Sequence, residues 1–327
     1  MRSRVAGVLA RRRGRVLAGL SLLLAALIAG HRAVPNTPGR FGSLLESFLP
    51  WLGLAVVPLL ALAALRRAPL ALLAGVLPVT AWVYAFGGLL LPAADPAGGA
   101  GGLLVVQHNV SDENADPAGT ARVLAAEGAD LIALEELVPD ALPAYEKALA
   151  SAYPFHEVRG TVGLWSRHPL TGARTVDIRP ADIEEPWSRG LRAVAATPHG
   201  EVAVYVAHLP SVRIGAAGLA SARRDESARL LGAALDAEEA AGPVIVLGDL
   251  NATVDDRGLA PLTSRLSVPE RGFAFSFPAL FPVARIDQVL ARDATVGRIR
   301  TLAETGSDHL PVAARVTPDR GAGGPRS

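Results

Sequence analysis

The feature that most constrains this chain is the uneven distribution of its charged residues. Residues 16–92 are almost free of charge and contain three long apolar runs, whereas residues from 103 onward have the composition of an ordinary soluble domain. A helix that crosses a membrane needs about 20 consecutive apolar residues. We therefore expect an N-terminal membrane segment followed by a separate globular domain, and not one soluble globule of 327 residues.

The three apolar runs predict three transmembrane helices, at about 16–31, 47–65 and 69–92. The first run is the shortest, and with its basic flank it also resembles the apolar region of a cleaved signal peptide. No small-residue cleavage pattern follows it, and two more apolar runs come next. We therefore expect the first helix to be retained, with cleavage as the alternative.

The arginines of the first hundred residues indicate how the spans are oriented. Six arginines precede the first run and Arg66–Arg67 separate the second from the third, but the loop between the first and second runs contains only Arg32 and Arg40. Cytoplasmic loops carry the excess of positive charge. The prediction is a multi-pass protein of the cell membrane, associated with the lipid bilayer, with a cytoplasmic N-terminus and an extracellular C-terminal domain.

The rest of the chain predicts one α/β domain. Residues 1–92 are the expected anchor, the Gly-rich segment 93–102 a flexible linker, 103–318 the globular domain and 319–327 a disordered tail. From residue 103, short β-type runs alternate with amphipathic helical stretches, and several connections are short enough for hairpins. This pattern favours a mixed β-sheet over a purely parallel one.

Composition excludes some chemistry and leaves the domain acidic. The chain has no cysteine, which excludes disulfides, thiolate metal sites and cysteine nucleophiles. Ten of the 32 Lys and Arg residues precede residue 103, and so do two of the 31 Asp and Glu residues. The remainder therefore holds 22 basic and 29 acidic side chains.

Polar residues recur where the predicted strands end. A lone Asn or His at such a place usually caps a turn, but a rigid scaffold also presents its ligands and catalytic groups there. The recurrence at six places predicts a functional site that contains Asn109, Glu136, His208, Asp249, Asn251, Asp287, Asp308 and His309.

Seven motifs in a fixed order resemble the endonuclease/exonuclease/phosphatase superfamily, which includes deoxyribonucleases, inositol polyphosphate phosphatases and neutral sphingomyelinases. They are QHNV, DLIALEEL, GLWSRHPL, YVAHLP, GDLNAT, RIDQVL and GSDHLPV, and the resemblance covers about Leu103 to Val316. It implies a four-layer sandwich of two mixed β-sheets flanked by helices, here preceded by the three transmembrane helices.

The resemblance also implies a role for each site residue. Asp249 would orient or deprotonate the attacking water, His309 would be the catalytic histidine, and Asp287 would hydrogen-bond it. Asn251 would hold the phosphate, and His208 occupies a position where several branches of the superfamily have a histidine. Glu136 would be the principal Mg²⁺ ligand, with Mn²⁺ as an alternative metal, and Asp308 and Asn109 would lie near the metal.

Two positions depart from the superfamily pattern. Where the superfamily usually has Gln-Glu this chain has Glu135-Glu136, so either residue is a candidate ligand; we take Glu136 because it aligns with the superfamily Glu. His208 replaces the Asn typical of apurinic endonucleases, which disfavours repair of apurinic sites.

The sequence therefore predicts a membrane-anchored, Mg²⁺-dependent hydrolase of phosphate esters, of the phosphodiesterase, nuclease or phosphatase type. The substrate, whether a lipid head group, a small phosphoester or a nucleic acid, stays open, and no obligate protein partner is indicated. The alternatives are a non-catalytic membrane-bound binding module on the same fold and a transporter-like protein with a soluble appendage. The predicted spans lack the buried ionisable residues that usually mark a transport pathway.

Overall fold

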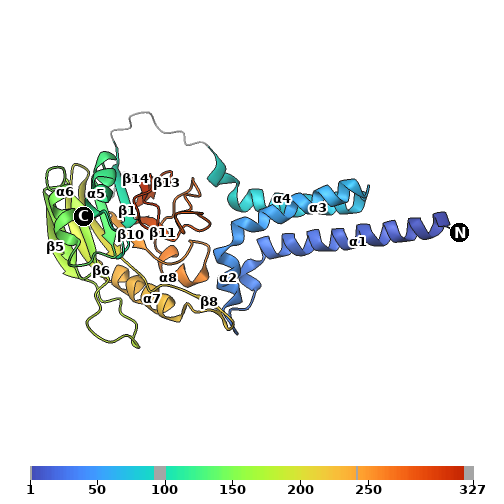
Figure 1. The fold of residues 1–327 in the computed structure, drawn as a ribbon, viewed down its shortest axis with the longest axis horizontal. Helices are drawn as coiled ribbons and strands as arrows, with labels where there is room; N and C mark the ends of the chain where they lie inside the picture. The colour runs from blue at the N-terminus through green and yellow to red at the C-terminus, as the bar shows by residue number, and fades with distance from the viewer. Residues whose placement is uncertain (1, 92–100, 241, 320–327) are drawn as a thin grey trace, which may run out of the picture. The chain divides into compact units, whose positions relative to one another are not determined.

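The structure is a computed structural model that describes residues 2–91, 101–240 and 242–319. The chain divides into two compact units, Met1–Leu91 and Pro92–Ser327, and each is described by itself (Figure 1). The first unit is helical, and every described strand belongs to the second. The predicted linker 93–102, apart from Gly101 and Gly102, lies outside the described residues, as does the predicted tail beyond Asp319.

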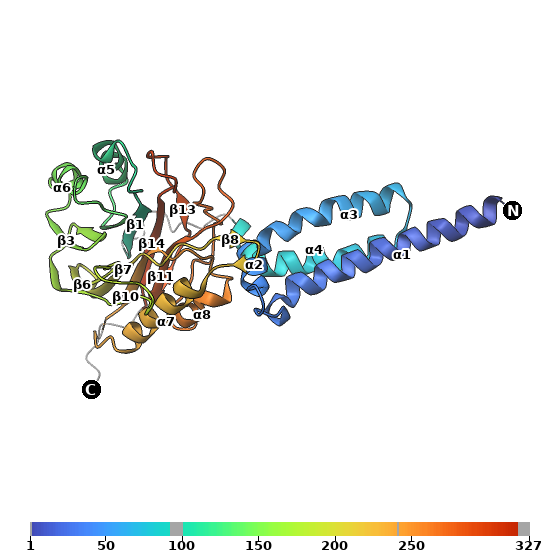
Figure 2. The ribbon, with the colours of Figure 1, turned by 60° about the horizontal axis from the view of Figure 1, so that its bottom comes forward.

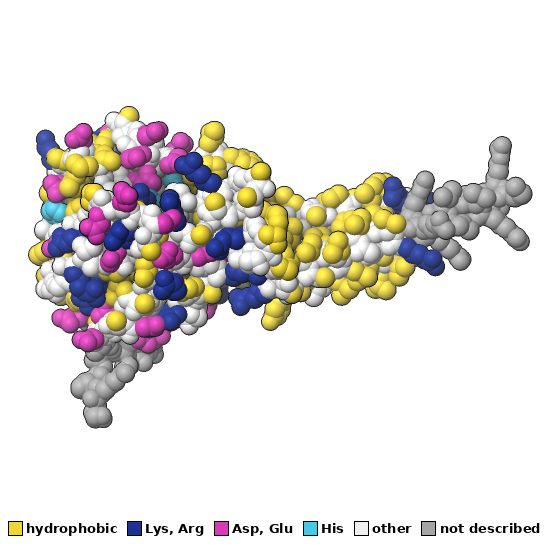
Figure 3. All heavy atoms as spheres, turned by 90° about the horizontal axis from the view of Figure 1, so that it is seen from below, with side chains coloured by type: hydrophobic (Ala, Val, Ile, Leu, Met, Phe, Trp, Pro, Cys, Tyr) yellow, Lys and Arg dark blue, Asp and Glu magenta, His cyan; other side chains and the backbone are white. Residues whose placement is uncertain are grey.

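Three helices form most of the first unit: α1 (Arg2–Ala29), α3 (Gly53–Leu65) and α4 (Pro69–Leu90). The short helix α2 (Phe41–Ser47) and a 3-10 turn (Leu49–Leu52) precede α3. Small residues bring α3 and α4 into close contact, because Gly53 leaves room for the indole of Trp82, which donates a hydrogen bond to the carbonyl oxygen of Pro50 at 2.7 Å. Hydrophobic side chains dominate the surface of this unit, whereas acidic and basic side chains mix over the second (Figure 3).

The prediction of three transmembrane helices is not supported. Among the described residues, only α4 is long and apolar enough to cross a membrane. The second predicted span is broken, because α2 and Leu49–Leu65 meet at 74°, so it adds at most one bent crossing. The first is a long helix, but its apolar part, Gly14–Ala29, is short because arginines crowd the preceding residues.

Two mixed sheets form the second unit. The seven-stranded sheet has the order β12 (Ala294–Val296), β14 (Val312–Pro318), β1 (Leu103–Asn109), β2 (Leu131–Glu135), β4 (Val162–Ser166) and β3 (Phe155–Arg159), with β13 (Arg300–Thr301) also paired to β14. The five-stranded sheet has the order β11 (Asp287–Arg292), β10 (Val244–Asp249), β7 (Gly200–Ala207), β6 (Gly190–Thr197) and β5 (Leu170–Thr175). Each sheet contains one parallel pair, β1–β2 or β10–β7, and its other pairs are antiparallel.

Alternation of side chains along the strands builds three apolar layers. Alternate residues of β1, β2, β7 and β10 fill the space between the two sheets, as Val105 and Ile245 do. The intervening residues pack outward, against α5 (Pro117–Ala126) and α6 (Leu142–Leu149) on one sheet, and against α7 (Ala222–Asp236) and α8 (Ala260–Thr263) on the other (Figure 2). Burial of each large aliphatic side chain contributes about 1.5–3 kcal/mol. The predicted pair of mixed sheets flanked by helices is confirmed.

Candidate active site

The candidate site forms where the core between the two sheets changes from apolar to polar. Residue parity explains the change, since successive side chains of a strand point to opposite faces. In β1 the inward positions Leu103 and Val105 are followed by Gln107 and Asn109, and in β2 Leu131 and Ala133 are followed by Glu135. The same parity turns three further polar side chains inward at the ends of β7, β10 and β11: His208, Asp249 and Asp287.

Asp249 lies at the centre of the site. Its Oδ2 accepts hydrogen bonds from the side-chain amides of Asn109 at 3.1 Å and Asn251 at 3.2 Å, and its Oδ1 accepts one from the backbone N–H of Asn251 at 2.9 Å. Gly248 immediately precedes it, and a Cβ there would collide with the carbonyl oxygen of Ala207 on the neighbouring strand. This close approach explains why a glycine stands before Asp249.

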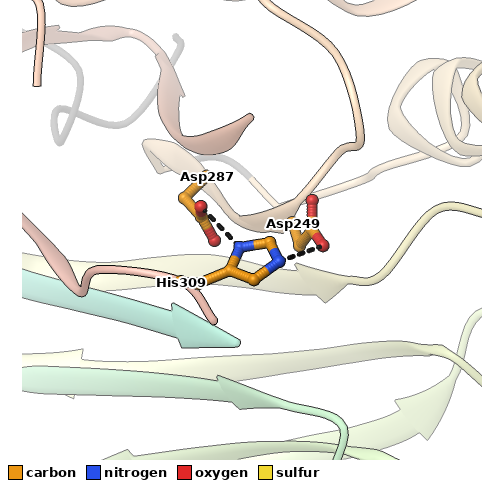
Figure 4. A group of neighbouring side chains, drawn as sticks. All are labelled: Asp249, Asp287 and His309. Atoms are coloured by element: carbon orange, nitrogen blue, oxygen red, sulfur yellow. Dashed lines mark hydrogen bonds and ion pairs between the residues drawn. The ribbon is translucent and has the colours of Figure 1, made fainter. Parts of the chain in front are cut away.

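His309 lies between two carboxylates (Figure 4). Its Nδ1 donates to Oδ2 of Asp287 at 2.9 Å, and its Nε2 faces Oδ2 of Asp249 at 3.8 Å. Burial alone would lower the pKa of His309, but the two carboxylates outweigh it and raise that pKa to about 10. Burial opposes ionisation of Asp287, yet His309 and hydrogen bonds from Ser276 and Gln107 keep the pKa of Asp287 low. His309 is therefore an imidazolium at neutral pH.

Asp249 and Asp287 are directly opposite each other on the paired strands β10 and β11. Burial raises the pKa of Asp249 to about 7, and the charge of Asp287 adds to the rise, although His309 opposes it. The carboxylate of Asp249 is thus tuned toward the range in which it can accept a proton near neutral pH.

His208 has the opposite protonation state to His309. Burial, reinforced by the nearby charges of Arg189 and His309, lowers the pKa of His208 to about 3. Its Nε2 lies 3.7 Å from a carboxylate oxygen of Glu136 and 3.7 Å from Oδ2 of Asp249. The site therefore contains one neutral and one charged imidazole on either side of Asp249.

The two adjacent glutamates have different surroundings. Glu135 is fully buried and accepts a hydrogen bond from Nε2 of Gln107 at 2.7 Å. Burial and the charges of Asp287 and Asp249 raise the pKa of Glu135 well above its usual range. Glu136 leaves the strand through a left-handed backbone conformation (φ 60°), and its side chain is 27% exposed beside His208. Of the two glutamates, Glu136 is thus the one whose carboxylate is accessible at the site.

The charge and donor atoms of the site fit a divalent cation. Several carboxylates face one another, and among the described residues the His309 imidazolium is the cation in direct contact with them. Their mutual repulsion helps to raise the pKa values of Asp249 and Glu135. Oxygen donors of this kind are the ligands that Mg²⁺ prefers. Asp249, Asp287 and His309 also bring ligand atoms within 4.8 Å of one another. His309 is a poor ligand, however, because its raised pKa keeps protons on both ring nitrogens, and a metal-binding imidazole must first lose one of them.

Asp308 is the predicted site residue with the fewest contacts. It is exposed, and within the described residues its carboxylate makes no hydrogen bond or ion pair with the other site residues. Its backbone oxygen accepts from the N–H of Ala279 at 2.7 Å, and its charge helps to raise the pKa of His309. The structure brings the other seven predicted residues together: each one apart from Asp249 lies against Asp249 or against a residue that contacts Asp249.

Sequence reasoning missed three side chains that shape this site. Gln107 joins the two sheets by donating to both Glu135 and Asp287. Ser276 donates to Asp287 at 2.5 Å, and Arg189 contacts His208 at 3.4 Å. Gln107 could have been predicted from the sequence, because it shares its strand face with Asn109. Ser276 lies in an irregular loop, where no periodicity indicates its direction.

Comparison with known proteins agrees with this geometry. The sequence profile of the Endonuclease/Exonuclease/phosphatase family matches residues 81–309. The chain belongs to this family. Its members are metal-dependent phosphoester hydrolases, and the match spans more than half of the chain. No curated protein sequence matches the chain.

Solved structures of other proteins share the fold. Sphingomyelinase C from Streptomyces griseocarneus is 22% identical, with a TM-score of 0.50 over 65% of this chain and 99% of that one. A humanized TDP2 of D. rerio is 18% identical, with a TM-score of 0.54 over 66% and 99%. Beta toxin from Staphylococcus aureus is 13% identical, with a TM-score of 0.53 over 65% and 99%. Identities this low establish the fold alone.

Proposed function

We propose that this family member is a membrane-tethered hydrolase of phosphate esters that uses Mg²⁺. The observation that supports it most is the environment of Asp249, whose Oδ2 receives two amide hydrogen bonds and faces a neutral and a protonated imidazole. Such a group is suited to orienting a water molecule and accepting its proton.

The residues divide the work as follows. Asp249 removes a proton from the attacking water, and its pKa of about 7 lets it exchange that proton near neutral pH. The imidazolium of His309, held by Asp287, stabilises negative charge that develops on the phosphate oxygens. The side-chain amides of Asn109 and Asn251 hold Asp249 in place. Both amides are themselves fixed, since Oδ1 of Asn109 accepts from the N–H of Ser111 at 3.0 Å and Nδ2 of Asn251 also donates to the carbonyl oxygen of Leu209 at 2.9 Å.

Glu136, with Asp308 and Asn109, is the proposed metal-binding group. A bound Mg²⁺, or Mn²⁺ as the alternative, would act as a Lewis acid on the phosphate and lower the repulsion between the carboxylates. Beta toxin from S. aureus, which shares the fold, has been solved with magnesium ions bound.

We also propose that the helical unit holds the enzyme in a membrane. Only 22% of the most apolar window of α4 is buried, and side chains such as Leu73 (71% exposed) and Tyr84 (93% exposed) point outward. A core helix of a soluble protein would bury these groups. Because Arg66–Arg67 precede α4, the positive-inside rule places that turn in the cytoplasm and, with α4 crossing once, the catalytic domain outside.

The location is tested by adding a protease to intact cells and then to permeabilised cells. If the domain is extracellular, intact cells release a fragment that begins within residues 93–102. Cleavage that occurs only after permeabilisation would place the catalytic domain in the cytoplasm.

We propose a lipid phosphodiester or a small phosphoester, and not duplex DNA, as the substrate. The 22 basic and 29 acidic side chains beyond residue 102 do not favour a long polyanion. An exposed apolar loop also lies beside the site: Leu280 is 94% and Phe281 73% exposed. The same loop is tied to the catalytic segment, because Phe277 packs on the ring of His309 at 4.8 Å and Ala279 donates to Asp308.

A screen with matched controls tests both the activity and the substrate. The full-length protein in detergent would be assayed with Mg²⁺ and with EDTA on sphingomyelin, phosphatidylcholine, inositol phosphates and duplex DNA, beside Asp249→Asn and His309→Ala. We expect Mg²⁺-dependent hydrolysis of a lipid or small phosphoester that both variants lose. A higher kcat/KM on DNA, lost in Asp249→Asn, would instead identify a surface nuclease. Equal activity of the variants would refute the assignment of the site.

A further inference from the structure

Arg189 lies at the edge of the site, immediately before β6. Its guanidinium rests over the ring of Trp187, 5.4 Å from the centroid, and one of its nitrogens is 3.4 and 3.5 Å from the two ring nitrogens of His208. The two rings hold the long side chain in one orientation. They also take the place of the ion pair that a half-buried arginine normally makes.

Arg189 makes no ion pair in the part of the chain that the structure describes. Within the described residues, no Asp or Glu oxygen lies within 4.0 Å of its guanidinium, whereas Arg192 pairs with Glu238 at 2.7 Å and Arg224 with Asp256 at 2.7 Å. Burial lowers the pKa of Arg189, and the charges of Glu136, Asp249 and Asp112 oppose this. A guanidinium remains protonated under such conditions. Arg189 is therefore a positive charge beside the site that forms no direct ion pair with a carboxylate of the described residues.

One neutral imidazole separates this guanidinium from the site's carboxylates. His208 contacts Arg189 on one side and lies 3.7 Å from both Glu136 and Asp249 on the other. We propose that Arg189 binds a non-bridging oxygen of the substrate phosphate, opposite the carboxylates that hold the cation and the water. This inference rests on the proposed function, and it assigns the anion-binding half of that site.

The backbone around Arg189 is positioned in advance. Its carbonyl oxygen accepts from the N–H of His208 at 2.9 Å, and the preceding residue, Ser188, accepts from Thr161 at 3.2 Å. Gly160 allows this contact, because a Cβ there would collide with the carbonyl oxygen of Ser188. A guanidinium fixed before substrate arrives loses little entropy when it binds phosphate.

The test compares Arg189→Gln and Arg189→Lys with Arg223→Gln, a matched loss of charge on α7 where the side chain is 57% exposed. Full-length protein in detergent would be titrated calorimetrically with inorganic phosphate in Mg²⁺ buffer, and kcat, KM and Tm would be measured in parallel. A charge-assisted hydrogen bond of this kind corresponds to about a 10- to 100-fold loss of phosphate affinity in Arg189→Gln. Arg189→Lys should retain part of the affinity, and Arg223→Gln all of it.

The outcomes separate this inference from the proposed function. Phosphate affinity that falls in Arg189→Gln while Tm is unchanged supports the inference, even if the wild-type protein hydrolyses no tested ester. Unchanged phosphate affinity in Arg189→Gln overturns it, whether or not hydrolysis is observed. A lower Tm with wild-type phosphate affinity would show that Arg189 only supports His208 and Trp187, and would also overturn it.

Discussion

Replacing Asp287 with Asn should change the protonation of His309. The carboxylate of Asp287 accepts from Nδ1 of His309 at 2.9 Å, whereas Asp249, the other carboxylate, is 3.8 Å away. An opposite charge at such a distance shifts a pKa by about 1–3 units. We therefore expect the pKa of His309 to fall from about 10 by that amount, which corresponds to about 1.4–4 kcal/mol of lost stabilisation of the imidazolium.

Histidine side-chain NMR of the metal-free protein in detergent measures this shift directly, without a substrate. Burial lowers the pKa values of His108 and His208 to about 3, so both stay neutral while His309 titrates. Ser276→Ala is the matched control, because it removes one hydrogen bond to Asp287 and leaves the charge. If Asp287→Asn left the titration midpoint of His309 near 10, another group would be protonating the imidazole and our account of the pair would be wrong.

Three further predictions follow from the same geometry. Glu136→Gln should raise the Mg²⁺ concentration needed for half-maximal activity about tenfold or more, because it removes a charged ligand. Glu135→Gln should leave that concentration nearly unchanged, because Glu135 is fully buried and its pKa is raised; the reverse order would make Glu135 the ligand. In a pH–rate profile, kcat/KM should rise as Asp249 loses its proton, at or below about pH 7 because a bound cation favours the carboxylate. It should fall as His309 loses its proton near pH 10. A profile that is flat from pH 4 to 11 would contradict both roles. Residues 101–319 alone should fold, because the three apolar layers are made entirely of residues of this unit, and circular dichroism should show one cooperative unfolding transition. Persistent aggregation in several detergent-free buffers would indicate that the helical unit completes the core of the domain.

The sequence predicts the long strands and the site better than it predicts the short elements. β1, β2, β7 and β10 have clear apolar runs, and the residues that end them are the ones that meet in the site. β3 and β5 could not be seen, because their exposed faces carry charged and small residues that do not alternate. The residues from Gly218 onward have the pattern of one long helix, but α7 starts only at Ala222, because Gly218–Leu219 (β9) pairs with Ile214–Gly215 (β8).

The resemblance favours Glu136 over Glu135 as the ligand, but the position of its side chain could not be derived from the strand pattern. Strand parity alone would direct Glu135 inward and Glu136 outward. The positive φ of Glu136 breaks that parity and returns its carboxylate to the site beside His208. Such a conformation is uncommon for a non-glycine residue and costs of order 1–3 kcal/mol, so only the surrounding structure can impose it.

The hydrogen bonds of Gln107 join residues that are far apart in the chain. Its amide donates to Glu135, 28 residues away in the same sheet, and to Asp287, 180 residues away in the other sheet. The contact of Gln107 with Asp287, the partner of His309, thus exists only when β1 and β11, which belong to different sheets, have come together. A partly folded chain would possess the residues of the site without their arrangement. If the protein has the proposed hydrolase activity, turnover should therefore return last during refolding, with the docking of the two sheets.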